Sequence, residues 1–362
     1  MKRIKKLLCL ILASLMLILC ACEKSPAIME YEGQVINAEM YTYWMSRYKA
    51  LFLYSYANST DSPDFWNTEV ADGITAETLF TNIIDENIKK NLACMYLFDK
   101  YSLALPSSTV SAIDADMEQL IEDIGGAKAF EEEADALGIN KKTLKEIYLI
   151  EEKIEYLRNH LYGTNGVEKI TDAQKKAYME DNYVRIRHIF FSTSPEYVLD
   201  ANGSYTYDEN GNIITKTPTA EEINKKKVTA EAVFERINQG EDFEKMLSEY
   251  TDDDASISYK NGFYLTSSID YIDEVTEAAF DMEVGEVRLV NSDYGVHIVK
   301  RYELQDKAYD DKSNADFFEN FDDAVISEIF QNKLAEHFDK ITVNTEEKSK
   351  YSIVTTKANL KI

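Results

Sequence analysis

The sequence is poor in the residues that build disulfides and metal centres. It holds four cysteines and four histidines in 362 residues. Three of the cysteines lie within the first 22 residues, and no His and Cys residues share the spacing of a zinc site. The remaining Cys94 lies in the apolar segment NLACMYLF, which is typical of a buried core thiol. We therefore expect no metal, and a fold that does not depend on disulfides.

Basic residues are also scarce. Lys and Arg total 39 against 65 Asp and Glu, which gives a formal net charge of −26. A nucleic acid is thus not expected as a partner, because its phosphates would be repelled. The charge indicates basic or unfolded protein partners instead. The length suits two or three domains, and a hydrophobic fraction of 45% is enough for their cores.

The sequence begins with one apolar run, LLCLILASLMLIL (7–19), which follows the cationic segment MKRIKK. Thirteen residues are too few to cross a bilayer, which needs about 20. The combination predicts a signal peptide over residues 1–21 rather than a membrane-spanning helix.

The end of this segment, Leu19-Cys20-Ala21-Cys22, resembles a bacterial lipobox, although Cys20 is unusual at its place in that motif. The resemblance implies that Cys22 carries lipid and holds the protein at the extracytoplasmic face of the cell membrane. An ordinary secretory signal with incidental cysteines is the alternative. With the signal removed and Cys22 lipidated, Cys94 would have no cysteine to pair with.

Helical periodicity dominates the sequence up to residue 182. Apolar residues recur at helical spacing, and Thr171 with Gln174 forms a capping box at the start of the last helix. A further amphipathic helix is expected near the C-terminus, followed by the strand-like segments ITVN and YSIVTT. The expected helices cover residues 36–56, 75–101, 109–124, 126–139, 140–163, 171–182 and 315–341.

At Tyr183 the period changes to alternation. The segment VRIRHIFF (184–191) predicts a strand with Ile186, His188 and Phe190 on one face. A histidine in that apolar row needs a partner, because burying an unpaired imidazole costs roughly 1–3 kcal/mol.

The sequence after this strand mixes both periods. A hairpin is expected in the insertion 196–219, with Asn210-Gly211 at its turn. It could contact a client or be an elaborated surface loop, and we favour the loop. Helices and two further strands follow, so that 184–304 is predicted to be a compact α+β unit.

Four blocks of this unit resemble the parvulin-type peptidyl-prolyl isomerases. They are the segment RIRHI at the first strand, FEKMLSEYTDDD (243–254), EAAFDMEVGEV (277–287) and YGVHIVK (294–300). The flanking helices resemble those of extracytoplasmic foldase lipoproteins, whose helical chaperone domain precedes the parvulin domain. The resemblance thus covers nearly the whole chain beyond the signal peptide, with its sharpest motifs in the parvulin unit.

The resemblance implies an α+β fold in which a parvulin domain, a small antiparallel sheet surrounded by helices, is inserted into a helical chaperone-like domain. The implied order is a signal peptide (1–21), an N-terminal helical domain (22–183), the parvulin domain (184–304), and a C-terminal helix and tail (305–362) that packs on the N-terminal domain.

The resemblance also assigns site residues. His188 and His297 are the paired histidines beneath the parvulin active site, and they could either scaffold the site or transfer protons. Asp253 falls at the catalytic polar position. The neighbours Asp252 and Asp254 leave this alignment open by one residue, and a solvated acidic turn is the alternative.

The residues that would contact the ring of the substrate proline, here called the proline seat, depart from the family pattern. Tyr271 and Val275 occupy positions that are methionine and phenylalanine in the family, and Phe263 or Tyr264 could compensate for the smaller valine. Weak or altered proline selectivity is therefore expected. No run of Arg or Lys follows His188, so selectivity for phosphorylated residues before proline is not expected.

These features predict a membrane-anchored foldase that isomerises X–Pro bonds in unfolded or newly secreted polypeptides without a cofactor. The alternative is a lipoprotein chaperone, or holdase, that keeps the parvulin unit as a scaffold. A solute-binding lipoprotein is a more remote alternative, because two α/β lobes are lacking. The sequence leaves the clients and a homodimer open.

Overall fold

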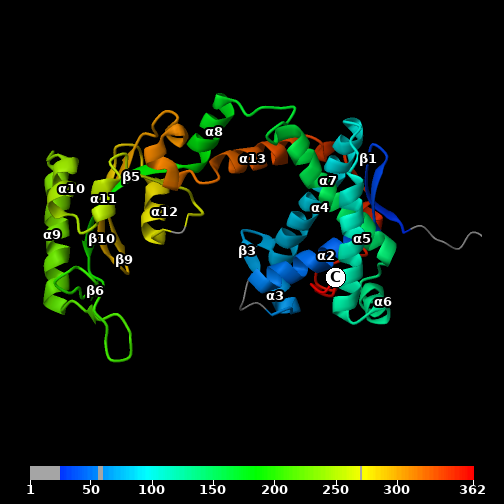
Figure 1. Ribbon diagram of the computed structural model, residues 1–362, viewed down its shortest axis with the longest axis horizontal. Helices are drawn as coiled ribbons and strands as arrows, with labels where there is room; N and C mark the ends of the chain where they lie inside the picture. Colours follow the sequence, from blue (N-terminus) through cyan, green and yellow to red (C-terminus); the bar gives the residue numbers. More distant parts are fainter. Residues whose placement is uncertain (1–24, 56–59, 270) are drawn as a thin grey trace, which may run out of the picture. The chain divides into compact units, whose positions relative to one another are not determined.

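A computed structural model describes residues 25–55, 60–269 and 271–362. The predicted signal peptide and Cys22 lie outside the described residues. The chain divides into two compact units. The first unit holds the described residues up to Lys169 together with Ser327–Ile362, and the second holds Ile170–Ile326. Figure 1 follows the chain through both. The predicted domain boundaries lie elsewhere, after residues 183 and 304, and stay a prediction.

The first unit begins with strands, which the sequence analysis missed. Strands β1 (Ala27–Tyr31) and β2 (Gln34–Asn37) form a hairpin whose turn, Glu32-Gly33, has positive φ at both residues. The strand β11 (Thr342–Val343) adds to the outer edge of β1, so the expected strand at ITVN is confirmed. The strand expected at YSIVTT is wrong, because residues 353–356 form turns.

The rest of the first unit is helical, as expected. The predicted helices 36–56, 75–101, 109–124, 126–139 and 140–163 agree with the observed bounds within three residues at either end. The helix predicted over 315–341 is shorter, and two short helices, Pro63–Asn67 and Thr345–Lys348, were not predicted. Asn140 caps the helix Lys141–Tyr162 by accepting a hydrogen bond from Thr143 N at 3.0 Å. A two-stranded ribbon of β3 (Glu69–Ala71) and β4 (Ile74–Thr75) precedes α4. The helices are α2 (Ala38–Ser55), α3 (Pro63–Asn67), α4 (Ala76–Lys100), α5 (Ser107–Ile124), α6 (Ala127–Ala136), α7 (Lys141–Tyr162), α13 (Phe321–Ala335), which starts in the second unit, and α14 (Thr345–Lys348).

Both ends of the described chain enter the core of the first unit. Trp44 and Ile88 from the N-terminal helices are buried in the same apolar cluster as Ile353 and Ile362. Lys49 is 1% exposed, and its ammonium donates to the Val354 and Thr356 carbonyls and pairs with Asp61 at 2.8 Å. A buried ammonium needs such partners, so these bonds fix the C-terminal segment in this unit.

The second unit is built around a four-stranded antiparallel sheet. Its order is β8-β5-β10-β9, with β5 (Val184–Ser192) and β10 (Gly295–Tyr302) in the centre. The edges are β8 (Phe263–Leu265) and β9 (Val287–Ser292). Its helices are α8 (Asp172–Asn182), with the expected Thr171 capping box, α9 (Ala220–Asn238), α10 (Phe243–Tyr250), α11 (Asp254–Ser258) and α12 (Asp273–Asp281).

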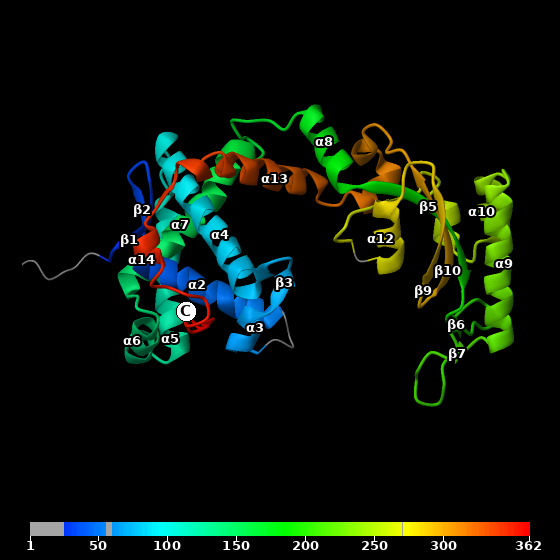
Figure 2. The same ribbon diagram turned by 180° about the vertical axis from the view of Figure 1, so that it is seen from behind.

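Helices cover both faces of this sheet. Figures 1 and 2 show α9 and α10 on one side of the strands and α12 on the other. Ile189 and Ile298 face the first pair of helices, where Met246 completes a buried cluster. Ile186 and Val299 face α12. The α+β class is therefore confirmed, and the alternation of VRIRHIFF reflects two different cores.

The insertion between β5 and α9 carries the expected hairpin. Tyr207 and Ile213 pair across the turn, Gly211 has φ +83°, and the Asp208 carboxylate accepts the backbone N–H groups of Asn210 and Asn212. The hairpin extends from the short pair β6 (Glu196–Tyr197) and β7 (Thr215–Lys216).

Candidate functional site

The sheet register brings His188 and His297 together. His188 on β5 lies opposite Val299, and His297 on β10 lies opposite Phe190, so both imidazoles project from the same face. Their Nδ1 atoms are 3.3 Å apart, and the rings are parallel within 5°. Both side chains are buried. The histidine in the apolar row of β5 thus has a hydrogen-bond partner.

Asp253 closes one end of the histidine pair. Its Oδ2 lies 3.1 Å from His188 Nε2 and 2.5 Å from the Ser256 hydroxyl. Asp253 also caps α11, because its two oxygens accept the backbone N–H groups of Ala255 and Ser256. Burial raises the pKa of this carboxyl, but the hydrogen bonds from His188 and Ser256 outweigh it and hold the pKa at about 2. Asp253 is therefore ionised at neutral pH.

The neighbouring acids have other partners. The Asp252 carboxylate accepts the Ser192 N–H at 2.9 Å and pairs with Lys226 at 2.8 Å. Asp254 is exposed in the first turn of α11. The contact with His188 is thus made by Asp253 at the predicted position, while its catalytic role stays a prediction.

Ser292, which sequence reasoning missed, closes the other end. Its hydroxyl lies 2.9 Å from His297 Nε2. Burial, and then the neighbouring His188, lower the pKa of His297 to about 3, so this ring is neutral at physiological pH. Ser292 pairs with Gly295 at the end of the β9-β10 hairpin, a register that the structure shows and that no motif in the sequence indicates.

Hydrogen bonds run along this row from Asp253 to Ser292. His188 Nε2–H donates to the ionised Asp253, and a single Nδ1–H lies between the two rings, on His188 or on His297. The His297 Nε2 and the Ser292 hydroxyl share the last hydrogen bond. Every polar group of the row therefore has a partner, which holds these side chains in one arrangement.

Tyr271 connects this row to a cavity. Its hydroxyl oxygen lies 3.3 Å from His188 Nε2. Burial and the charge of Asp253 raise the pKa of the Tyr271 phenol, so the hydroxyl keeps its proton. The tyrosine also lines a cavity of about 380 Å³, together with Phe190, Ser192, Ser194, Ile272 and Tyr294. A polar group fixed at the wall of an apolar cavity is typical of a small binding site.

The other predicted seat residues lie in the core. Phe263 is 6% exposed and packs edge-on against the His188 ring, with centroids 5.3 Å apart. Val275 on α12 has no exposed surface. Tyr264 points to the opposite face of β8, where its hydroxyl donates to Gln305 at 2.7 Å. Of the predicted seat, only Tyr271 lines the cavity, and the substrate-binding roles of Phe263, Tyr271 and Val275 stay predictions.

A tight loop positions Phe263 and α11 against β5. Gly262 has φ +86°, and a Cβ there would lie 2.4 Å from the Ile186 carbonyl oxygen. The buried Arg187 donates to the carbonyls of Ser256 and Lys260, at 2.7 and 3.0 Å, and pairs with Glu244 at 2.7 Å. These contacts hold the segment that carries Asp253 and Ser256 in one place.

Among the described residues, no cluster of His, Cys, Asp and Glu has the arrangement of a metal site. In the same part of the chain, no helix combines the length and apolar character needed to cross a membrane.

Comparisons with known proteins find relatives of the second unit. A family model described as the PPIC-type PPIASE domain matches residues 168–305. The foldase protein PrsA of Halalkalibacterium halodurans is 30% identical over 121 residues, which are 31% of this chain and 36% of the relative. The PrsA of Geobacillus kaustophilus is 34% identical over 107 residues, 29% and 35% of the two chains. The match thus spans about a third of the length of these two relatives.

Two longer matches extend over both units. The PrsA of Caldanaerobacter subterraneus subsp. tengcongensis is 22% identical over 321 residues, 86% of this chain and 85% of the relative. The crystal structure of PrsA from Bacillus subtilis is 21% identical and covers 83% of this chain and 95% of that one, with a TM-score of 0.24.

Proposed function

We propose that this chain, whose residues 168–305 form a peptidyl-prolyl isomerase domain of the PPIC type, isomerises X–Pro bonds in unfolded polypeptides and so assists their folding. The observation that carries the proposal is the buried histidine pair, held between Asp253 and Ser292 and linked to a cavity through Tyr271. Uncatalysed X–Pro isomerisation takes tens to hundreds of seconds and limits folding.

Catalysis requires only that the twisted amide be bound better than the planar one. Rotation breaks amide resonance, so negative charge leaves the carbonyl oxygen and the prolyl nitrogen gains a lone pair. A hydrogen-bond donor aimed at that nitrogen therefore acts in the transition state and not in the ground state. Two of the described residues that line the cavity contact the histidines: Phe190 stacks on His297, and Tyr271 hydrogen-bonds to His188. Of these two, only Tyr271 carries a hydrogen-bond donor.

In this mechanism the histidine row positions Tyr271. His188 Nε2–H donates both to Asp253 and to the Tyr271 oxygen, which leaves the phenolic proton free to point into the cavity. The phenol keeps this proton because its pKa is raised. The ring of the substrate proline would contact Phe190 and Ile272 on the cavity wall. The cycle needs no proton transfer and no cofactor.

A chaperone with a weakly active isomerase domain is the second candidate. It is favoured by the burial of Val275, because a fully buried side chain cannot contact a proline ring in the cavity. Under this candidate, the first unit would hold unfolded chains and prevent their aggregation.

One experiment separates the two candidates. Isomerisation of a proline peptide would be measured for the chain from Cys22 onwards and for His297→Ala, Asp253→Ala and Tyr271→Ala. We expect a rate well above background that falls in all three variants. A background rate from the unaltered chain, together with suppressed aggregation of an unfolded client, would favour the chaperone.

We also propose that Cys22 is lipidated and anchors the protein at the extracytoplasmic face of a membrane. The lipobox-like end of the leader supports this proposal. Cys22→Ser should move the protein from the membrane fraction to the medium, and continued membrane retention would contradict lipidation.

A further inference from the structure

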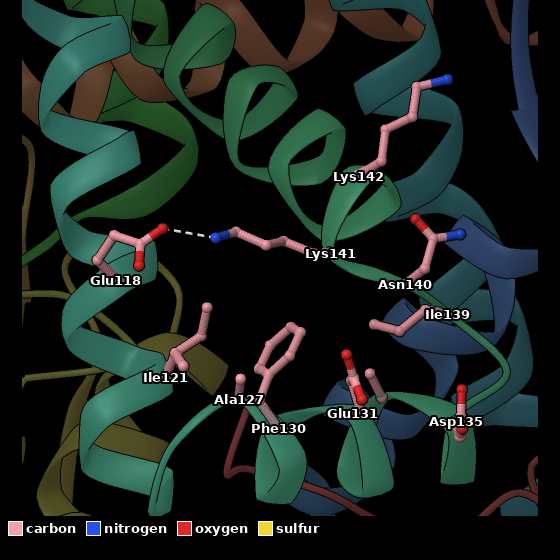
Figure 3. Close-up of a pocket in the computed structure, with 11 residues that line it drawn as sticks. Glu118, Ile121, Ala127, Phe130, Glu131, Asp135, Ile139, Asn140, Lys141 and Lys142 are labelled. Atoms are coloured by element: carbon pink, nitrogen blue, oxygen red, sulfur yellow. Dashed lines mark hydrogen bonds and ion pairs between the residues drawn. The ribbon is translucent and has the colours of Figure 1, made fainter.

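The first unit contains a cavity that the proposed isomerase does not use. It lies between α5, α6 and the start of α7 and has a volume of about 410 Å³ (Figure 3). Phe130 and Ile139, which are both buried, form its floor, and Ile121 forms one side. A cavity of this volume has room for one large apolar side chain. Burying such a side chain against the apolar lining would gain roughly 1.5–3 kcal/mol.

Two carboxylates at this cavity lack the cationic partners that their neighbours have. Of the four acids on α6, Glu132 pairs with Lys128 at 3.6 Å, and Glu133 pairs with Lys361. Glu131 and Asp135 line the cavity, and in the described parts of the chain no Lys or Arg pairs with either. They are four residues apart on one helix, where like charges repel.

The two lysines at the cavity do not neutralise these carboxylates. The Lys141 ammonium is 2.5 Å from Glu118 across the cavity, as the dashed line in Figure 3 marks. Lys142 pairs with Glu146 at 3.5 Å. The cavity therefore combines an apolar floor with two negative charges that have no counterion from the described chain.

We infer that this cavity binds a segment of unfolded polypeptide in which Lys or Arg stands next to a large apolar residue. The apolar side chain would occupy the space above Phe130, and the cation would lie between Glu131 and Asp135, where it relieves their repulsion. The net charge of −26 would attract such segments over a longer range and repel acidic ones.

This binding does not depend on proline or on the isomerase site, so it can be tested separately. The probe is a fluorescein-labelled, proline-free peptide with one Phe flanked by lysines. Matched probes carry Glu in place of Lys, or Gly in place of Phe. Using the chain from Cys22 onwards, which keeps every described residue, we expect only the Lys-Phe probe to bind, and to bind less tightly as salt is added.

Three variants locate the binding. Glu131→Gln/Asp135→Asn should weaken the Lys-Phe probe about fivefold, because two partly exposed ion pairs are lost. Ala127→Trp, which fills the cavity from its exposed rim, should abolish binding. The control Glu122→Gln/Glu132→Gln removes the same charge from exposed positions outside the cavity and should leave binding unchanged.

Several outcomes would overturn the inference. Equal loss of binding in the control would show that binding depends on the net charge of the protein and not on these two carboxylates. Unchanged binding in Ala127→Trp would show that the peptide binds outside the cavity. Equal binding of the Glu-Phe probe would remove the role of the two carboxylates. A change of oligomeric state in Ala127→Trp would show that the cavity receives a second copy of the chain. Circular dichroism of each variant would verify its folding.

Discussion

At the scale of single residues, the neutrality of His297 ties stability to pH. Its folded-state pKa of about 3 lies below the ordinary value of 6.5, so the unfolded chain binds the extra proton. Stability of the second unit should therefore fall as pH drops from 6.5 towards 3, with a contribution of about 1–2 kcal/mol between pH 6.5 and 5. Asp253, whose folded pKa is about 2, adds a loss in the same direction below its ordinary value of 3.8.

Hydrogen exchange of the β10 amides at pH 7 and pH 5 would measure this effect. His297→Gln should flatten the dependence, since glutamine does not titrate. Equal pH dependence in the variant and the unaltered chain would assign the effect to other titrating groups of the second unit.

The hydroxyl of Tyr271 gives a second prediction at this scale. Tyr271→Phe should lower kcat about tenfold with little change in KM, because it removes a hydrogen bond that forms in the transition state and keeps the apolar ring. A rise in KM at constant kcat would show that the hydroxyl only binds the substrate. Tyr271→Met is the matched variant, since it restores the family residue without a donor.

At the scale of secondary-structure elements, the turn before β8 depends on Gly262. Gly262→Ala should destabilise the second unit by about 2–3 kcal/mol and lower isomerase activity. Alanine is strained at φ +86°, and its Cβ would contact the Ile186 carbonyl oxygen. Urea unfolding and the proline-peptide assay would measure both effects.

Gly211 provides the matched control. Its φ is +83°, but a Cβ there would meet no atom within 4 Å. Gly211→Ala should cost only the backbone strain of about 1 kcal/mol and leave activity unchanged. If the two variants lost equal activity, close approach at Gly262 would not be what positions the site.

The elements that could be predicted from sequence are those with a local signal. The helical periodicity and the caps at Asn140 and Thr171 are short-range features, and the helix bounds agreed closely. Strands β1 and β2 were missed because each is short and because β1 pairs with β11, more than 300 residues away. A sequence pattern cannot show such a pairing.

The candidate site divides in the same way. The histidine pair followed from alternation within β5 and from the resemblance of the motifs. The cavity could not be predicted from the sequence, because its wall combines residues of β5, the β9-β10 turn and the segment before α12. Val275 aligned with a seat residue, yet it lies within the core, since alignment gives the position of a residue and not its exposure.

At the scale of the whole molecule, the first unit depends on its C-terminal residues. Ile353→Ala should destabilise this unit by about 2–4 kcal/mol, because Ile353 has no exposed surface. Both tryptophans, Trp44 and Trp66, are buried in the first unit, so their fluorescence reports its unfolding specifically.

The matched variant is Leu360→Ala in the same segment. Leu360 is 49% exposed, so its loss should cost less than about 0.5 kcal/mol. Equal midpoints for the two variants in urea would contradict a core role for the C-terminal segment.

The pairing of β1 with β11 also sets an order of events during synthesis. The second unit is one continuous stretch, Ile170–Ile326, and all its strands have emerged before Thr342 is made. The first unit cannot complete its sheet or its core until Val343, Ile353 and Ile362 arrive. We therefore expect a chain emerging from a ribosome or a translocon to fold its isomerase domain first. The finished domain would then be present while the rest of its own chain is still incomplete.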